Sequence, residues 1–345
     1  MQTGGSPIAT EVVLVGGGHS HALLLRMLGM KPWHGIAVTL ISDVTHTPYS
    51  GMLPGLVAGI YEYEEAHIDL RRLCQFAGVR FIRAEVSGLD LEQKRVQLEG
   101  RPSVRFDLVS LNTGSRPEMA NVPGARAHAV PAKPVPVFLD RWEAILREAE
   151  SDQAGRRLVI VGGGAGGVEL AVGMKERLGD TAEVSIVHQG DALLSTHNEG
   201  VQKRFAAILD KRKIAVHLKE SVIEVVETGV LCQSGLKLEA DSVFWVTNAG
   251  APAWPAESGL AVDERDFVRI GETLQSVSHP FVFATGDLAS MEDHPRPKSG
   301  VFAVRMGRPL FQNLRRHALG QSLIDYKPQK EFLSLIGTAT RSAVA

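Results

Sequence analysis

A glycine-rich turn supplies the residues of this 345-residue chain whose spacing could do chemistry. In RLVIVGGGAGGVELA (157–171), Gly162, Gly164 and Gly167 follow an apolar strand with the spacing Gly-x-Gly-x-x-Gly. These glycines allow a tight turn, a close approach of the backbone to a pyrophosphate, and close packing of a helix on a strand. A pyrophosphate bound there meets free N–H groups at the positive end of the helix dipole. The spacing therefore predicts a dinucleotide site at this turn.

An earlier turn in the chain, VVLVGGGHSHALLL (12–25), departs from this pattern at one place. Gly16 and Gly18 occupy the first two glycine positions, and His21 occupies the third. Because the third glycine lets the helix approach the strand, we expect this helix to lie further off or to turn His21 outward. Ser20 is expected to cap the N-terminus of the helix. We interpret the turn as a modified phosphate cradle.

The two histidines of this turn raise the question of a metal site. His19 and His21 are two residues apart, so their side chains leave a helix in different directions, and no carboxylate lies within the turn. Uncharged imidazoles can instead line the entrance of a cofactor site. We therefore expect polar residues at a cofactor site and no metal.

The two turns belong to a repeated unit. An offset of 146 residues carries Gly16 onto Gly162, and it also carries the apolar strand AVTLIS onto EVSIVH. Each unit then closes on a strand and a small-residue turn, DLVSLNTGSRP with Gly114 and DSVFWVTNAGAP with Gly250. A strand–turn–helix–strand unit that occurs twice predicts an α/β fold with two Rossmann-like dinucleotide-binding domains.

The ends of the second strands bear on which nucleotide binds. A carboxylate at that place commonly accepts the ribose hydroxyls. The first unit has Ser42 or the adjacent Asp43 there, and the second has His188 or Gln189, with Asp191 a little beyond. The second unit thus has neither an acid at the usual place nor an arginine for a 2′-phosphate. NADH and NADPH both remain open.

Charge and composition narrow the possible partners. The chain has 37 basic and 39 acidic residues, which gives no general attraction to nucleic acid or to an anionic membrane. No run approaches about 18 uninterrupted apolar residues, so no transmembrane segment is expected. No secretory leader precedes the strand at Val12, so a cytoplasmic location is expected.

The cysteines exclude one class of mechanism. The chain has 2 cysteines, Cys74 and Cys232, with no Cys-x-x-Cys motif and no zinc spacing. We expect two unpaired thiols in a reducing compartment. No reactive cysteine pair is therefore available to relay electrons.

Two further motifs carry a resemblance to a known family. Together with the two nucleotide units, LNTGSRP (111–117) and PFVFATGDLAS (280–290) resemble the two-dinucleotide-binding flavoproteins of the pyridine nucleotide–disulfide oxidoreductase superfamily. The resemblance implies that Gly286 lets the backbone approach a flavin and that Asp287 binds the ribityl chain or pyrophosphate of FAD. A simple Gly-Asp β-turn is the alternative for this tripeptide.

A narrower resemblance covers nearly the whole chain. GGGHSH (16–21), HTPYSGMLPGLVAGIY (46–61), AKPVPVFLDRWE (132–143) and QKEFLSLIGTATRSAVA (329–345) resemble the type II NADH dehydrogenase-like module at the N-terminus of some selenophosphate synthetases (selenide, water dikinases). It implies a fused or associated selenophosphate synthetase domain as a partner. The disulfide enzymes and the sulfide–quinone reductases need cysteines that this chain lacks.

The resemblance also implies cofactor sites residue by residue. The FAD site is expected at the first glycine turn, the following strand ends and the start of a late helix: Gly16, Gly18, His19, Ser20, Ser42, Asp43, Met52, Leu53, Pro54, Thr113, Gly114, Gly286, Asp287, Lys298, Ser299, Gly300 and Val301. For Met52 and Leu53, core packing is an equal alternative. The NAD(P)H site is expected at Gly162, Gly164, Gly167, Glu169, His188 and Gly250.

The expected architecture inserts one domain in the other. Residues 1–126 and 257–325 would form the FAD domain, 127–256 the NAD(P)-binding domain, and 326–345 the truncated start of a C-terminal segment. Proline-rich stretches at 123–138 and 250–259 are expected to be the crossing linkers.

The expected activity follows from these sites. A hydride would pass from NAD(P)H to FAD, and electrons would pass on to a quinone-like or other small acceptor without a cysteine relay. The alternative is an FAD-binding regulatory or partner-docking module of selenium metabolism with little turnover.

Overall fold

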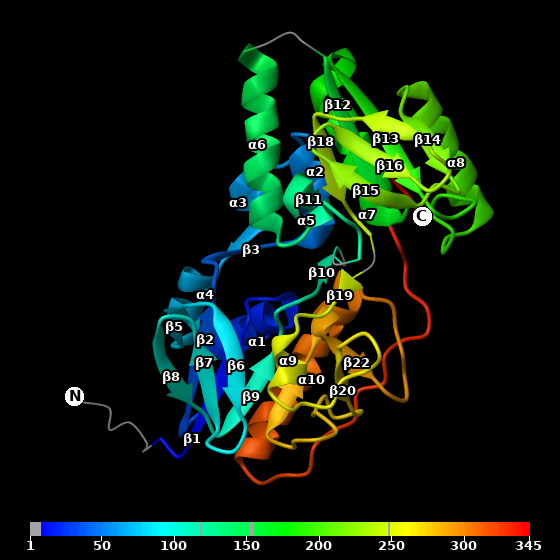
Figure 1. The fold of residues 1–345 in the computed structure, drawn as a ribbon. Helices are drawn as coiled ribbons and strands as arrows, with labels where there is room; N and C mark the ends of the chain where they lie inside the picture. Colours follow the sequence, from blue (N-terminus) through cyan, green and yellow to red (C-terminus); the bar gives the residue numbers. More distant parts are fainter. Residues whose placement is uncertain (1–7, 118, 120, 152–154, 248) are drawn as a thin grey trace. The chain divides into compact units, whose positions relative to one another are not determined.

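The computed structural model describes residues 8–117, 119, 121–151, 155–247 and 249–345. The chain forms two compact units, each assembled from separate stretches of sequence (Figure 1). Unit 1 contains the chain up to Ser50, His67–Ser115 and Gly250–Phe332. Unit 2 contains Gly51–Ala66, Arg116–Ala249 and Leu333–Ala345.

The units are bounded differently from the predicted domains. Residues 51–66, which the sequence places in the first domain, pack in unit 2, and so does the end of the chain from residue 333. The reason for the first difference is α2 (Leu53–Val57), whose apolar side chains are buried in the core of unit 2 with those of α7 (Ala165–Leu178). A short apolar segment does not indicate which of two cores it joins.

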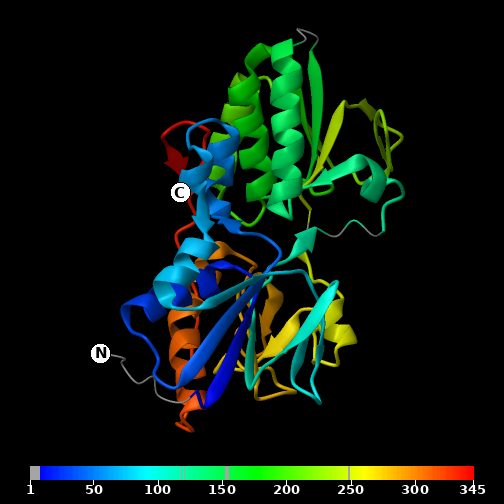
Figure 2. The ribbon, with the colours of Figure 1, turned by 90° about the vertical axis from the view of Figure 1, so that its left-hand side faces the viewer.

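Unit 1 is built on a parallel sheet of buried, apolar strands, as expected for a sheet covered on its faces. Helices α1 (His19–Met30), α4 (Leu70–Ala77) and α10 (Gly300–Ala318) belong to this unit, and Figure 2 shows α10 in orange running beside the blue strands. The strand order is β21 (Val282–Ala284), β9 (Leu108–Leu111), β1 (Thr10–Val15), β2 (Ile36–Ser42) and β5 (Arg80–Arg83).

Unit 2 repeats this topology, as the sequence repeat predicts. Its helices include α6 (Val135–Ser151), α7 and α8 (Glu199–Lys211). The strand order is β11 (Ala129–Pro131), β18 (Ser242–Trp245), β12 (Arg156–Val161), β13 (Ala182–His188) and β14 (Ala215–Leu218). The predicted α/β fold with two Rossmann-like units is confirmed.

Each unit also contains a three-stranded antiparallel sheet, followed along the chain by the strand that closes the repeat. The sheet of unit 1 comprises β6 (Val86–Asp90), β7 (Arg95–Leu98) and β8 (Arg101–Arg105), and that of unit 2 comprises β15 (Val222–Val226), β16 (Gly229–Cys232) and β17 (Lys237–Glu239). The remaining short elements are β3 (His46–Pro48), η1 (Ser50–Met52), α3 (Tyr63–Ala66), β4 (His67–Asp69), β10 (Arg116–Pro117), α5 (Ala125–His128), η2 (Gly179–Thr181), β19 (Ala249–Gly250), α9 (Trp254–Glu257), β20 (Val268–Ile270), η3 (Gly286–Leu288), β22 (Ala289–Met291), β23 (Ile336–Gly337) and β24 (Ala343–Val344).

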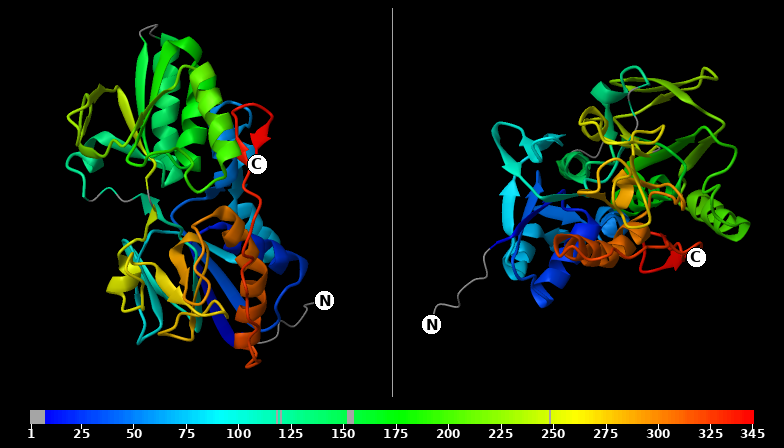
Figure 3. Two further views of the ribbon diagram at one scale, coloured as in Figure 1. Left: turned by 90° about the vertical axis from the view of Figure 1, so that its right-hand side faces the viewer. Right: turned by 90° about the horizontal axis from the view of Figure 1, so that it is seen from below.

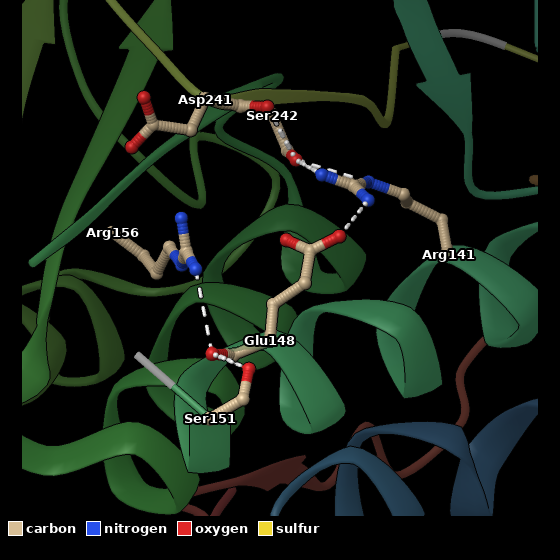
Figure 4. Close-up of polar contacts among 6 residues, drawn as sticks. All are labelled: Arg141, Glu148, Ser151, Arg156, Asp241 and Ser242. Carbon is tan, nitrogen blue, oxygen red and sulfur yellow. Dashed lines mark hydrogen bonds and ion pairs between the residues drawn. The ribbon is translucent and has the colours of Figure 1, made fainter. Parts of the chain in front are cut away.

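A polar cluster holds α6 to the sheet of unit 2 (Figure 4). The Arg141 guanidinium donates from Nη1 to Glu148 Oε1 at 2.9 Å and from Nη2 to Ser242 Oγ at 2.8 Å. Arg156 Nη2 donates to the Glu148 carbonyl oxygen at 3.4 Å. Ser242 and Arg156 begin β18 and β12. The cluster therefore lies at the amino ends of the strands, away from the carboxyl ends where ligands of such sheets bind.

His21 lies beneath the first glycine turn and is fully buried. Its Nδ1 donates to the Gly16 carbonyl oxygen at 2.7 Å. In the neutral ring Nε2 is then the acceptor, and it lies 2.8 Å from the Ser110 hydroxyl on β9. Of the two expected arrangements, the one in which His21 turns outward is wrong, because both ring nitrogens have partners inside the unit. A helix that lies further from the strand stays a prediction.

The expected capping role of Ser20 is also wrong. The N-cap of α1 is Gly18, and Ser20 lies within the first turn of the helix. Its hydroxyl is buried and donates to the Ala303 carbonyl oxygen at 2.5 Å. Ser20 therefore joins α1 to α10.

The burial of His21 makes the stability of unit 1 depend on pH. Burial lowers the pKa of His21 from 6.5 to about 4. The unfolded chain therefore binds a proton that the folded chain does not, and the free energy of unfolding falls as the pH decreases from 6.5 towards 4. A shift of this size is equivalent to roughly 3 kcal/mol. We expect urea unfolding to show this loss in the wild type and a smaller loss in His21→Asn, measured against His34→Asn, an exposed control in the same unit. Equal pH dependence in all three proteins would contradict a buried neutral His21.

Candidate functional site

The second glycine turn lies where β12 ends and α7 begins. Gly162 has φ +128°, and a Cβ there would lie 2.5 Å from the Val246 carbonyl oxygen. A Cβ on Gly167 would lie 1.9 Å from the Gly162 carbonyl oxygen. Gly164 is the N-cap of α7, and a Cβ there would meet nothing within 4 Å. Close contacts within the protein explain why residues 162 and 167 are glycines. At Gly164 the space beside the backbone is open, as a pyrophosphate site needs.

The first glycine turn resembles the second at its first glycine and differs from it at the second glycine. Gly16 has φ +90°, and a Cβ there would lie 2.5 Å from the Asn112 carbonyl oxygen. Gly18 is the N-cap of α1, and its glycine identity is explained by Asn112, whose Oδ1 would lie 2.2 Å from a Cβ. Gly18 has no side chain to cap α1, and the His21 N–H in the first turn donates to Asn112 Oδ1 at 3.5 Å. The positive end of the α1 dipole lies at this turn, where it favours an anion.

Asn112 is a residue of this site that the sequence analysis missed. It is buried at the end of β9, and its Nδ2 donates to the Thr285 carbonyl oxygen at 2.9 Å. It thus joins the first glycine turn to the strand that precedes Gly286. A polar residue that directly follows a buried apolar strand was the available indication.

The predicted Gly286 and Asp287 lie at the same edge of the unit 1 sheet. Gly286 has φ +65°, and a Cβ there would lie 2.5 Å from Asn112 Nδ2. The Asp287 carboxylate accepts a hydrogen bond from Ser115 Oγ at 3.3 Å. The two residues before Ser115 are the predicted Thr113 and Gly114. Thr113 is exposed, and Gly114 has φ +76° with nothing within 4 Å of a Cβ. Carboxyl strand ends that meet at one edge form the ligand-binding edge of such sheets.

Other predicted residues of unit 1 are placed as follows. Ser42 is buried at the end of β2 and accepts a hydrogen bond from the Val44 N–H at 3.4 Å, whereas Asp43 is exposed. Because Asp43 is exposed and Ser42 is buried, Asp43 is the better candidate for a ribose contact. The His19 ring contacts the Tyr49 ring edge-on, with centroids 5.0 Å apart.

A cavity of about 160 Å³ in unit 1 brings several predicted residues together. Its lining includes Gly286, Asp287, Lys298 and Ser299, the last of which is the N-cap of α10; Gly300 and Val301 begin that helix. Lys298 Nζ donates to the Ala289 carbonyl oxygen at 2.6 Å and lies 3.7 Å from the centre of the Phe267 ring. Burial lowers the pKa of Lys298 to about 8, although Asp263 and Asp287 favour its charged form.

Met52, Leu53 and Pro54 belong to unit 2. Leu53 is 7% exposed and packs in the core of that unit, which is the alternative that the sequence left open. Pro54 stands in the first turn of α2. A flavin contact by these residues stays a prediction.

His188 ends β13 at the predicted ribose position of unit 2. Its Nδ1 accepts a hydrogen bond from the Gly163 N–H at 3.2 Å, so the ring is neutral at that nitrogen. Burial lowers the pKa of His188, against the opposing effects of the Ala192 backbone and of Asp191. The ring covers Gly163, where a Cβ would lie 2.6 Å from its Cγ. His188 therefore stabilises the glycine turn itself.

Glu169 lies two residues beyond Gly167, on α7. Its Oε1 accepts a hydrogen bond from the Gly337 N–H at 2.6 Å, and burial raises the pKa of Glu169 to about 7. Gly250, the last of the predicted nucleotide contacts, ends β19 and is half-buried. The Gly337 contact could not be found from the sequence, because the two residues are 168 positions apart.

Cys74 and Cys232 lie in different units, Cys74 in unit 1 and Cys232 in unit 2, and both are free thiols. Burial raises their pKa to about 12 and about 11, respectively. Thiols with such a pKa are poor nucleophiles and electron carriers at neutral pH. Among the residues that the structure describes, no three His, Cys, Asp or Glu side chains are grouped to hold a metal ion. The helices in the described ranges include none long and apolar enough to cross a membrane.

Comparison with known proteins agrees with this geometry. The chain is 25% identical over 346 residues to the demethylphylloquinone reductase NdbB of Synechocystis sp., covering 94% of this chain and 84% of that protein. It is 21% identical to the NADH dehydrogenase-like protein YutJ of Bacillus subtilis, covering 96% and 91%. The sulfide:quinone oxidoreductase of Aquifex aeolicus has the same fold, with a TM-score of 0.77, 16% identity, and coverage of 96% and 82%.

Residues 10–307 match the family model of the pyridine nucleotide-disulphide oxidoreductases. The predicted enzyme class and the predicted cofactors are confirmed: FAD and NAD(P)H. The chain therefore belongs to the pyridine nucleotide-disulphide oxidoreductase family and is an FAD-dependent NAD(P)H oxidoreductase.

Proposed function

We propose that this chain transfers a hydride from NAD(P)H to FAD and passes the electrons directly to a quinone-like acceptor, without a cysteine relay. The observation that carries this proposal is the pair of glycine turns, each between the first strand and the first helix of a Rossmann-like unit, combined with two buried thiols that lie in different units. The two turns fit two dinucleotides, and the thiols fit no disulfide chemistry.

In unit 1, the residues present fit FAD. Gly16 and Gly18 would hold the pyrophosphate at the start of α1, and the exposed Asp43 would accept ribose hydroxyls. Asp287 would accept hydrogen bonds from the ribityl chain. The N-terminus of α10, with Lys298 beside it, would place positive potential at the pyrimidine ring. When bound, FAD supplies the two-electron chemistry, and the chain supplies orientation and electrostatics.

In unit 2, the residues present fit NAD(P)H. Gly164 leaves its backbone open to a pyrophosphate, and α7 adds the positive end of its dipole. Glu169 and His188 are the further contacts in unit 2 that we propose. Gly250 lies in unit 1, at the start of its last stretch, and a nucleotide contact there stays a prediction. The nucleotide choice stays open, because His188 uses Nδ1 to hold Gly163 and neither an acid nor an arginine occupies the ribose position.

The name of one relative supports a quinone-like electron acceptor. NdbB is named a demethylphylloquinone reductase, which is a quinone-reducing activity. The resemblance to a module attached to selenophosphate synthetases remains a prediction. The second candidate function, an FAD-binding regulatory or partner-docking module, is favoured by one observation: the place of the ribose carboxylate is taken by His188, which is committed to the turn.

Anaerobic addition of NADH or NADPH should bleach the visible absorbance of the FAD-loaded protein, because the nicotinamide reduces the flavin. The absorbance is recorded after each addition of nucleotide. A flavin that stays oxidised with both nucleotides would rule out the oxidoreductase proposal in favour of the regulatory module.

A soluble quinone added with the nucleotide that bleaches the flavin should be reduced at a steady rate. The rate, followed as nucleotide oxidation, should be the same in Cys74→Ser and Cys232→Ser as in the wild type, because neither thiol carries electrons. If either variant retains FAD but loses turnover, the relay-free mechanism is wrong.

Asp287→Ala should weaken FAD binding by about tenfold or more, because a carboxylate acceptor of ligand hydroxyls is lost. The measurement is the ratio of flavin to protein after dialysis, and the dissociation constant for added FAD. Asp325→Ala, which changes an exposed carboxylate of the same unit, is the matched control and should retain FAD. Equal flavin content in both variants would remove Asp287 from the site.

A further inference from the structure

Residues 333–345, the C-terminal hairpin, hold a carboxylate of the second glycine-turn helix. Strands β23 and β24 of the hairpin pair antiparallel, with Gly337 opposite Ala343. The Gly337 N–H points away from this pairing and donates to Glu169 Oε1 at 2.6 Å. Oε2 of Glu169 has no hydrogen-bond partner in the part of the chain that the structure describes. One carboxylate oxygen is thus fixed, and the other is left to a ligand.

The hairpin is fixed to the helices of its own unit, so the Gly337 amide has a defined position. Arg212, which follows α8, donates from Nη1 to the Thr338 carbonyl oxygen at 2.7 Å and from Nη2 to Glu176 on α7 at 2.8 Å. Ile336 is 1% exposed within the core of unit 2. Figure 3 (left) shows the red hairpin beside these green helices.

No neighbouring charge competes with this hydrogen bond. Elements α2, β12, β13, β23 and η2 pack against α7. Their titratable groups are Arg156, Arg157, Asp180, Glu183 and His188, and α2 and β23 have none. The pKa of Glu169 is set by burial, which raises it, and by the Gly337 N–H, which lowers it. Within the described residues, the hairpin amide is therefore the group that favours the carboxylate form.

We propose that the Gly337 amide is a positioning group for the nicotinamide nucleotide: it holds Glu169 as a carboxylate with Oε1 fixed, so that Oε2 accepts a hydrogen bond from the nucleotide. An ionised carboxylate only accepts hydrogen bonds, and the carboxamide N–H₂ of nicotinamide is a matching donor. This inference rests on the proposed function, in which Glu169 contacts NAD(P)H. The C-terminal hairpin is then part of the nucleotide site, although it is distant from the glycine turn in sequence.

Two substitutions at one position separate the amide from the hairpin. Gly337→Pro removes the N–H, and the φ of Gly337 lies outside the left-handed region that proline cannot adopt. Gly337→Ala keeps the N–H, and its Cβ would lie 3.4 Å from Glu169 Oε1, an ordinary contact. Glu169→Gln is the third variant, because a carboxamide of the same size cannot ionise.

The measurement is calorimetric titration of the FAD-loaded proteins between pH 5.5 and 9, about two units either side of neutrality. The ligand is NAD⁺ or NADP⁺, whichever corresponds to the nucleotide that bleaches the flavin, because the oxidised form binds without turnover. Wild-type affinity should fall as the pH decreases through about 7, where Glu169 takes up a proton. In Gly337→Pro the fall should begin about one pH unit higher, since a hydrogen bond to the charged form is lost. Gly337→Ala should match the wild type, and Glu169→Gln should bind weakly without this fall.

The possible results separate this inference from the proposed function. A wild type whose flavin no nucleotide bleaches contradicts the proposed function. A wild type that is bleached but binds nucleotide with no inflection near neutral pH, or a folded Gly337→Pro with an unshifted profile, overturns the role of the hairpin. If Gly337→Pro does not fold, ¹⁵N-glycine labelling of the wild type gives the same decision. The Gly337 amide resonance should titrate with Glu169, at a lower pH when nucleotide is bound, and a resonance that does not titrate overturns the proposal.

Discussion

Both units depend on the contact between one backbone carbonyl oxygen and the glycine that follows the first strand. In unit 1 a Cβ on Gly16 would lie 2.5 Å from the carbonyl oxygen of Asn112, and in unit 2 a Cβ on Gly162 would lie 2.5 Å from the carbonyl oxygen of Val246. Only a glycine with positive φ can turn the chain there. The helix begins three residues later, at His19 in unit 1 and at Ala165 in unit 2, so its N-terminus lies at the carboxyl edge of the sheet.

The third glycine position shows that this constraint has two solutions. In unit 2 a Cβ on Gly167 would collide with the carbonyl oxygen of Gly162, so a side chain is excluded. In unit 1 the corresponding carbonyl oxygen, that of Gly16, accepts a hydrogen bond from the His21 ring. The polar group that forbids a side chain in one unit is the partner of a side chain in the other. Ser110 on β9 completes the arrangement by satisfying the second nitrogen of that ring.

The sequence predicts the parts of the molecule that depend on local pattern. Strand periodicity and the glycine spacing give the α/β fold and locate both turns, because they act within a βαβ unit of about thirty residues. The offset of 146 residues then predicts that the unit occurs twice. The sequence does not predict contacts made across the sheet or across the chain. Asn112 with Thr285, His21 with Ser110, and Glu169 with Gly337 each join residues from separate segments. The sequence analysis placed residues 51–66 in the first domain, whereas they pack in unit 2, because an apolar segment fits either core.

The buried titratable groups of the two units differ in the charge that they place near the predicted cofactor sites. His21 stays neutral beneath the first turn, so an anion bound there depends on the N–H groups and the dipole of α1, not on an imidazolium. Lys298, near the start of α10, has its pKa lowered by burial and keeps a bond to Ala289, so it adds a charge whose position is fixed. Unit 2 instead places an acidic group, Glu169, one helical turn beyond its phosphate turn, where burial raises the pKa of Glu169 and one amide opposes that rise. An acid at that distance disfavours a pyrophosphate less than one within the turn, and it can still meet a donor further along a bound nucleotide.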